Sequence, residues 1–163
     1  MGLLHQPGGY QYLVCSVNLS PHFTYAEFTR SDTALRLGVS NDLPIGLVAN
    51  AHETTGMLER IREFLGCPMN VTSGYRCMAL NKAIGSKDTS DHVKALACDF
   101  TVTGMPPFVI AKKLAAAVDE LKIGQLIYEH HWVHVGVPVP EKVLNRILTV
   151  QKWGYISGVN DVA

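Results

Sequence analysis

A single acidic residue interrupts the most strand-like stretch of this chain. Residues 96–102 are apolar or β-branched apart from Asp99, and this composition predicts a β-strand. An ionised carboxylate buried in such a strand costs several kcal/mol or more unless a cation or several hydrogen-bond donors meet it. The fold must therefore bring such partners to Asp99, or leave its side chain facing solvent or capping a turn.

Two histidines are placed where they could meet this carboxylate. His92 lies seven residues before Asp99, at the end of a polar loop, and His134 lies in a second apolar segment, residues 132–137. Two imidazoles and one carboxylate make a three-ligand set for a divalent metal. Three protein ligands leave a fourth position for water, as catalytic zinc requires, whereas structural zinc takes four. The alternative is that each histidine is an ordinary core residue.

The remaining patterns predict one α+β domain over residues 1–163. Apolar residues at three- and four-residue intervals predict a helix over 44–65, with Pro44 in its first turn and Gly66 after its end. Further helices are expected at 77–84 and 106–121, strands at 69–72, 96–102, 125–129 and 132–137, and a loop with a turn of helix at 20–32. Residues 145–152 fit a strand or a helix, and residues 1–19 are interpreted as a lead-in segment. We expect a small, mostly antiparallel sheet that carries the metal site, with helices packed on it.

Composition excludes several classes of protein. Lys and Arg together number 14, as do Asp and Glu, so the chain lacks the basic excess of a nucleic-acid-binding protein. It has no apolar run of 18 residues, which argues against a transmembrane helix, and its first residues lack the basic start of a signal peptide. The four cysteines form no CxxC pair and are expected to be reduced, although a Cys67–Cys77 disulfide stays open.

Three motifs together resemble a known family. They are Ser73–Arg76 (SGYR), Ser90–Asp99 (SDHVKALACD) and Trp132–His134 (WVH). Their order and spacing resemble the zinc D-alanyl-D-alanine carboxypeptidase family, which also contains phage L-alanoyl-D-glutamate endopeptidases. Residues 20–31 and 58–66 are similar to the N-terminal part of phage and prophage members, so that the likeness covers most of the chain.

The resemblance implies roles for named residues. His92, Asp99 and His134 would be the ligands of Zn²⁺, and Arg76 would bind a substrate carboxylate or polarise the scissile carbonyl. A planar guanidinium suits a carboxylate because it can pair with both oxygens. Ser90 would form a hydrogen bond near the metal or brace the loop as a cap.

The general base has two candidates. Glu129 lies five residues before His134 and fits the Q-L-I-x-E pattern of phage-like members, so it is favoured as the base. His131 is the alternative base or an oxyanion donor, unless it and His130 only occupy an exposed turn. Ala95 stands where the family usually has glycine, and alanine is tolerable there if the backbone φ is negative.

By this resemblance the chain is expected to be a zinc metallopeptidase that cuts stem peptides of bacterial peptidoglycan, as a carboxypeptidase or an endopeptidase. The protein is expected to be a monomer. It would act as a phage lysis enzyme that stays in the host cytoplasm until it is released to the cell wall, or as a component of the virion. The competing hypothesis is a zinc-bearing binding or virion structural module without catalytic activity.

Overall fold

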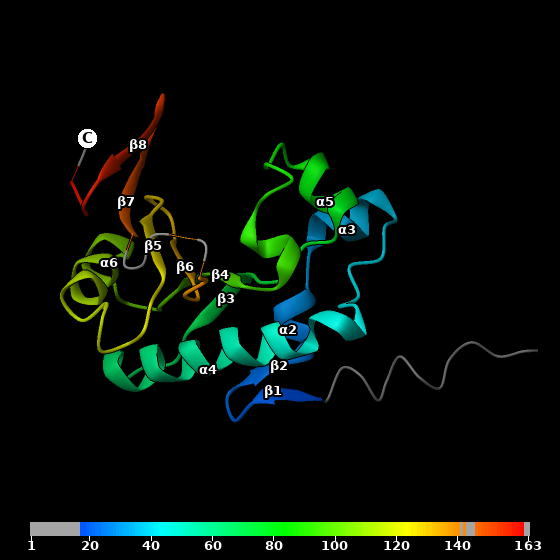
Figure 1. Cartoon of the computed structure of the whole chain (residues 1–163), viewed down its shortest axis with the longest axis horizontal. Helices are drawn as coiled ribbons and strands as arrows, with labels where there is room; N and C mark the ends of the chain where they lie inside the picture. Colours follow the sequence, from blue (N-terminus) through cyan, green and yellow to red (C-terminus); the bar gives the residue numbers. More distant parts are fainter. Residues whose placement is uncertain (1–16, 141, 143–145, 162–163) are drawn as a thin grey trace, which may run out of the picture.

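The computed structural model describes residues 17–140, 142 and 146–161 (Figure 1). Within them, six strands form the main sheet in the order β3-β4-β6-β5-β7-β8, and β1 and β2 form a separate sheet. The strands are β1 (Asn18–Ser20), β2 (Phe23–Thr24), β3 (Asn70–Ser73), β4 (Ala97–Thr101), β5 (Gln125–Tyr128), β6 (Val133–Gly136), β7 (Arg146–Gln151) and β8 (Gly154–Ser157). The α-helices are α2 (Tyr25–Thr29), α3 (Asp32–Leu37), α4 (Val48–Leu65), α5 (Met78–Ala83) and α6 (Pro107–Ala116), and the 3₁₀ helices are η1 (Ile45–Leu47) and η2 (Asp91–Lys94).

The main sheet is antiparallel except at one pair of strands. Neighbouring strands from β3 to β5 run antiparallel, β7 joins β5 in parallel, and β8 returns antiparallel to β7. The expected α+β fold with a mostly antiparallel sheet is therefore confirmed. Residues 145–152, for which the sequence fitted either a strand or a helix, form strand β7 from residue 146 onward.

The two faces of the sheet have different chemistry because side chains alternate along each strand. Asp99 on β4 is paired with His134 on β6, which is paired with Ile127 on β5, so these three side chains share one face. Their neighbours along the strands point to the opposite face and belong to the main hydrophobic core; they are Cys98, Phe100, Leu126, Tyr128, Val133 and Val135. One face of the sheet thus serves packing and the other is free to carry chemistry.

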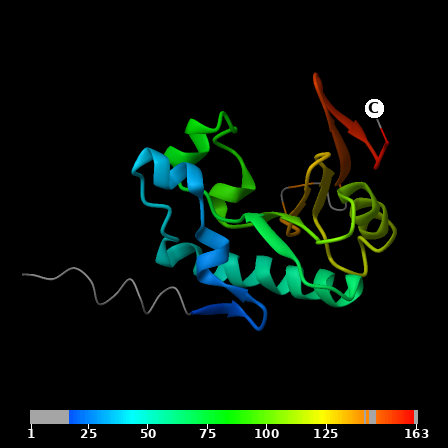
Figure 2. The ribbon, with the colours of Figure 1, turned by 180° about the vertical axis from the view of Figure 1, so that it is seen from behind.

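Helices α4 and α6 supply the other side of this core (Figure 2). The predicted helix over 44–65 is confirmed as η1 followed by α4, and it ends at Gly66, which adopts the left-handed conformation with φ of 69°. Gly66 donates its N–H to the carbonyls of Arg62 and Glu63, which satisfies two of the carbonyls left open at a helix end. The buried side of α4 includes Met57.

Two parts of the chain differ from expectation. Residues 20–32 hold more regular structure than a loop with one turn: β2, the five-residue helix α2 and the first residue of α3. Helix α6 ends at Ala116 rather than near residue 121, because Ala117 leaves the helical conformation with φ of −124° and ψ of 18°. Turns follow, in which Ile123 bonds back to the carbonyl of Val118 before β5 begins. The lead-in segment was expected over residues 1–19; residues 1–16 lie outside the described residues, whereas Asn18 and Leu19 belong to strand β1.

Two expectations from composition, reduced cysteines and no transmembrane helix, concern the described part of the chain. Cys67, Cys77 and Cys98 are free thiols. The alternative of a disulfide between Cys67 and Cys77 is therefore not realised. None of the described helices combines the length and the apolar character that crossing a bilayer requires.

The small β1–β2 sheet is tied to α4 through one carboxylate. Ser20 donates to Glu59 Oε1 at 2.6 Å, and His22 contributes its backbone N–H to Oε1 at 2.8 Å and its Nδ1 to Oε2 at 2.7 Å. Burial opposes ionisation of Glu59, but these hydrogen bonds and the charge of His22 hold its pKa below the ordinary value. The ionised carboxylate therefore stabilises the folded state.

We expect Glu59→Gln to lower the free energy of unfolding by about 1–2 kcal/mol at neutral pH, since hydrogen bonds to a charged group are lost. Because the folded-state pKa is depressed, the contribution is complete above the unfolded-state pKa and is lost as pH falls through the folded-state value. Urea denaturation at several pH values should show the wild type and variant converging in acid. Glu63→Gln, at an exposed position on the same helix, is the matched control. A difference in the free energy of unfolding between the wild type and Glu59→Gln that does not change with pH would contradict this account.

Candidate metal centre

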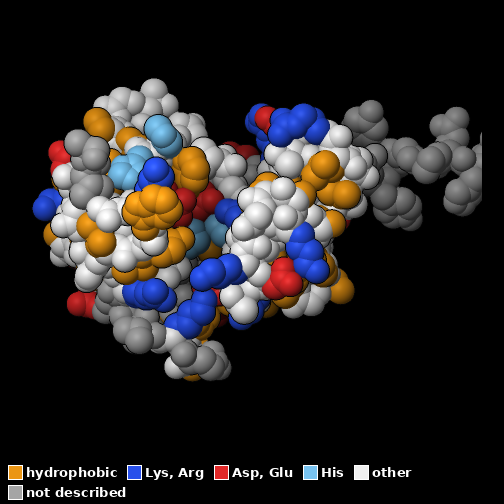
Figure 3. Space-filling model, turned by 90° about the horizontal axis from the view of Figure 1, so that it is seen from above, with side chains coloured by type: hydrophobic (Ala, Val, Ile, Leu, Met, Phe, Trp, Pro, Cys, Tyr) orange, Lys and Arg blue, Asp and Glu red, His pale blue; other side chains and the backbone are white. Residues whose placement is uncertain are grey.

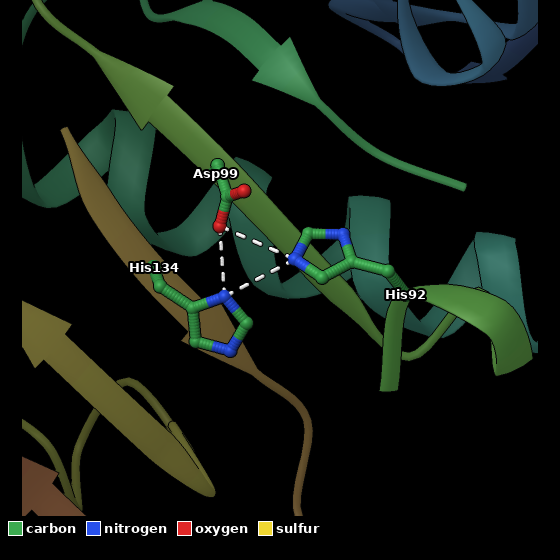
Figure 4. A group of neighbouring side chains, drawn as sticks. All are labelled: His92, Asp99 and His134. Carbon is green, nitrogen blue, oxygen red and sulfur yellow. Dashed lines mark hydrogen bonds and ion pairs between the residues drawn. The ribbon is translucent and has the colours of Figure 1, made fainter. Parts of the chain in front are cut away.

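Three predicted ligands converge on the polar face of the sheet (Figure 4). His134 Nδ1 lies 2.7 Å from Asp99 Oδ1, His92 Nε2 lies 3.3 Å from the same oxygen, and the two ring nitrogens are 3.2 Å apart. Asp99 comes from β4 and His134 from the paired position on β6, while His92 reaches them from η2. All three residues are buried.

The ring of His92 is oriented by a backbone carbonyl. Its Nδ1 lies 2.7 Å from the carbonyl oxygen of Gly74, so the proton of a neutral ring resides on Nδ1 and the lone pair of Nε2 faces Asp99 and His134. Burial lowers the pKa of His92, although the charge of Asp99 acts in the opposite direction. Burial thus favours the neutral ring, which is the form that binds a metal.

Gly74 occupies its position because no larger residue fits. A Cβ atom at this position would lie 2.3 Å from the carbonyl oxygen of Phe28 in α2, and the amide of Tyr75 donates to that same oxygen at 2.8 Å. The side chain of Asn41 bonds the carbonyl of Tyr75 and the amide of Cys77 on either side of Arg76. The N-terminal part of the chain thus holds the turn that orients His92.

The turn between His92 and Asp99 contains a strained residue. Ala95 has φ of 56° and ψ of 29°, so the condition under which alanine would be tolerated without strain, a negative φ, is not met. An L-residue in this left-handed region costs about 1–2 kcal/mol, which explains why glycine suits the position. The Ala95 amide donates to the His92 carbonyl, and the Ala95 carbonyl accepts from Thr54 Oγ1 at 2.8 Å, so the turn is anchored on α4.

Arg76 is the second partner of the buried carboxylate. Its Nη2 lies 2.7 Å from Asp99 Oδ2, and its Nε donates to Ser73 Oγ at 2.8 Å. The side chains of Arg76 and Asp99 are only 12% and 7% exposed. The cation that burial of Asp99 demands is thus present, and Asp99 Oδ1 is left to face the two histidines.

Asp99 is ionised in this environment. Burial would raise its pKa, but the two histidines, whose nearest ring nitrogens lie 3.3 Å (His92) and 2.7 Å (His134) from Oδ1, outweigh it and hold the pKa far below the ordinary value. A carboxylate and two imidazole nitrogens are donors that zinc prefers. Donors around a tetrahedral ion with bonds of about 2.0–2.1 Å lie about 3.3 Å apart, close to the two separations that involve His92 Nε2, 3.3 Å and 3.2 Å. The donor set fits such an ion.

The cluster opens into a cavity of about 810 Å³, which Glu129 also lines. In Figure 3, acidic and histidine side chains lie at the bottom of a hollow between two raised parts of the surface. Glu129 is half-buried just after the end of β5. Burial and the negative charge of Asp99 raise its pKa, which brings the carboxyl group closer to the range of a proton-transfer group.

The comparison with known families agrees with this geometry. A model of the family Peptidase M15 matches residues 21–136, more than half of the chain. The chain belongs to the peptidase M15 family. This is a family of metal-dependent peptidases, typically with zinc, and the matched range contains all three residues of the cluster. A search among curated proteins found no match.

The other candidate residues of this M15 family member occupy different positions. Ser90 lines the cavity and caps η2, where its Oγ accepts from the amide of His92. Trp132 also lines the cavity. His131 is exposed and is not among the described residues that line the cavity, and His130 bonds the carbonyl of Val150 on β7 at 2.9 Å.

Several residues that hold the M15 site in place were not singled out in the sequence. Asn41, Thr54 and Phe28 are distant from the motifs in sequence, and their hydrogen bonds to the motifs are made with backbone carbonyls and amides of the motif residues. No spacing rule connects such residues to a ligand. Tyr155 on β8 was also missed: it lines the cavity although it lies beyond the part of the chain that matches the family.

Proposed function

We propose that this M15 family member is a zinc-dependent peptidase that hydrolyses peptide bonds in the stem peptides of bacterial peptidoglycan. The observation that carries the proposal is the buried cluster of His92, Asp99 and His134 at the base of a cavity that also contains Glu129. The motif resemblance to enzymes that cut D-alanyl-D-alanine and L-alanoyl-D-glutamate bonds supports the choice of substrate.

In this proposal His92, Asp99 and His134 hold the zinc ion. When bound, the ion supplies Lewis acidity toward the scissile carbonyl and lowers the pKa of water at the site to about 7. Arg76 keeps Asp99 ionised and aimed at the histidines, and its remaining N–H groups line the cavity, where they bind a substrate carboxylate or the carbonyl oxygen. Ser90 braces the short helix that carries His92.

Glu129 is the proposed general base. It accepts a proton from the attacking water and delivers this proton to the amine that leaves when the peptide bond breaks. Its position in the cavity and its raised pKa suit this exchange, because the group must both take up and release a proton. His131 remains the alternative base or oxyanion donor, but its exposed position outside the cavity lining gives it less support.

The proposed location of the enzyme follows from the location of its substrate. Peptidoglycan lies outside the bacterial membrane, so a phage lysis enzyme would remain in the host cytoplasm until release, and a virion-associated enzyme would reach the wall from outside. We propose one of these two locations and a monomeric enzyme.

Purified sacculi provide the test. The zinc-loaded protein is expected to release soluble peptides from them, a chelator should stop the release, and added zinc should restore it, because the Lewis acid is required. Mass spectrometry of fragments from defined muropeptides would identify the bond and distinguish carboxypeptidase from endopeptidase action. A protein that binds zinc and sacculi but releases nothing would instead support the non-catalytic module.

A further inference from the structure

The β7–β8 hairpin forms part of the cavity although it lies outside the family match. The match ends at residue 136, while the hairpin covers residues 146–157. It is joined to the catalytic part by the parallel pairing of β7 with β5, in which Ile127 is opposite Leu148. In Figure 1 the hairpin extends away from the sheet beyond the ends of β5 and β6.

The strand register places one face of this hairpin toward the metal-ligand cluster. Ile127 shares a face with Asp99 and His134, and its partner Leu148 continues that face onto β7. Arg146 lies two residues before Leu148, and Tyr155 on β8 is paired with Val150, two residues after it. Alternation therefore puts Arg146, Leu148 and Tyr155 on the face of the cluster, and all three line its cavity.

The phenol of Tyr155 and the proposed base, Glu129, line the same cavity. Burial raises the pKa of Tyr155, and the negative charges of Glu129 and Asp99 raise it further. The hydroxyl group is therefore protonated at neutral pH and is able to donate a hydrogen bond within the cavity.

Arg146 supplies a positive charge that no described carboxylate neutralises. No carboxylate among the described residues forms an ion pair with Arg146, whereas Arg76 is paired with Asp99 and Lys142 with Asp91. A guanidinium group on a cavity wall, next to an aliphatic side chain and a phenol, suits a peptide that carries a carboxylate.

We propose that the β7–β8 hairpin is the substrate-binding wall of this cavity, where Arg146 binds a carboxylate of an acidic peptide and Tyr155 donates a hydrogen bond to that peptide beside Glu129. The proposal rests on the proposed function and deepens it. It adds Arg146, a residue outside the motifs, to the recognition of the substrate, beside Arg76, which also holds Asp99.

The test for Arg146 uses binding rather than turnover. In the zinc-loaded Glu129→Gln protein, calorimetry measures the Kd of a synthetic stem peptide with free carboxylates and of the same peptide with all carboxyl groups amidated. Arg146→Gln is expected to weaken binding of the acidic peptide about tenfold and to leave the amidated peptide unchanged, since only the charged hydrogen bond is lost. Lys152→Gln removes the same charge from the tip of the hairpin, outside the cavity lining, and is the matched control.

The test for Tyr155 uses the active protein. Tyr155→Phe removes only the hydroxyl and is expected to lower kcat/KM about tenfold on the same peptide, with zinc content and thermal midpoint unchanged. Equal affinity of the Arg146→Gln and Lys152→Gln proteins for the acidic peptide, together with wild-type turnover by Tyr155→Phe, would overturn the proposal. A wild-type protein that neither binds nor cuts any stem peptide would instead overturn the proposed function itself.

Discussion

Replacing Asp99 by alanine is expected to abolish turnover and to loosen the metal. Asp99 contacts both histidines and Arg76, so its loss removes a ligand and leaves the buried Arg76 cation without its partner. Metal affinity should fall by more than about 100-fold, since changes to groups that merely support a ligand already cost about 10–100-fold. His92→Ala should act in the same way because it also removes a ligand.

The measurement is zinc content after dialysis, taken together with hydrolysis of a stem peptide. Asp99→Asn keeps the shape of the side chain and separates loss of the ligand from loss of packing. Asp88→Ala is the control, because Asp88 is an exposed carboxylate in the loop before His92. Full zinc retention by a folded Asp99→Asn protein would remove Asp99 from the ligand set.

Replacing Glu129 by glutamine is expected to slow catalysis strongly without releasing the metal. The amide cannot accept the proton of the attacking water, and loss of general-base catalysis lowers kcat by about 10²–10⁴-fold. Glu129 is not a member of the His92, Asp99 and His134 cluster, so zinc content should equal that of the wild type. Stopped assays of peptide release and metal analysis on the same samples check both statements.

His131→Ala is the matched variant for this experiment. His131 is exposed and lies two residues beyond Glu129, so its loss should leave kcat close to the wild-type value. The opposite pattern, with a slow His131→Ala enzyme and a normal Glu129→Gln enzyme, would transfer the base role to His131.

The convergence of the cluster could be predicted because its residues lie in strongly patterned segments. An acidic residue within an apolar strand requires a partner, and the antiparallel pairing of β4 with β6 places His134 directly opposite Asp99. Helix α4 could also be predicted, since apolar residues recur at helical spacing over a long segment and Gly66 ends it. The strand and helix patterns are local in sequence, whereas the pairing of Asp99 with His134 joins residues 35 apart.

The errors have physical causes of other kinds. Helix α2 begins with a capping box between Thr24 and Glu27, a T-x-x-E signal that was present but overlooked. The positive φ of Ala95 is imposed by the turn into β4 and by the bond from Thr54, which no spacing reveals. The ion pair of Arg76 with Asp99 likewise depends on the pairing of β3 with β4 rather than on the SGYR motif alone.

The parallel pairing of β7 with β5 has a consequence for shortened versions of this protein. A chain cut at residue 136 would keep the three cluster residues but would leave one row of β5 amides and carbonyls without partners. An unprotected edge of this kind invites pairing with other molecules and aggregation. The last two strands therefore protect the solubility of the catalytic part, and insoluble truncated protein would not by itself indicate a damaged metal site.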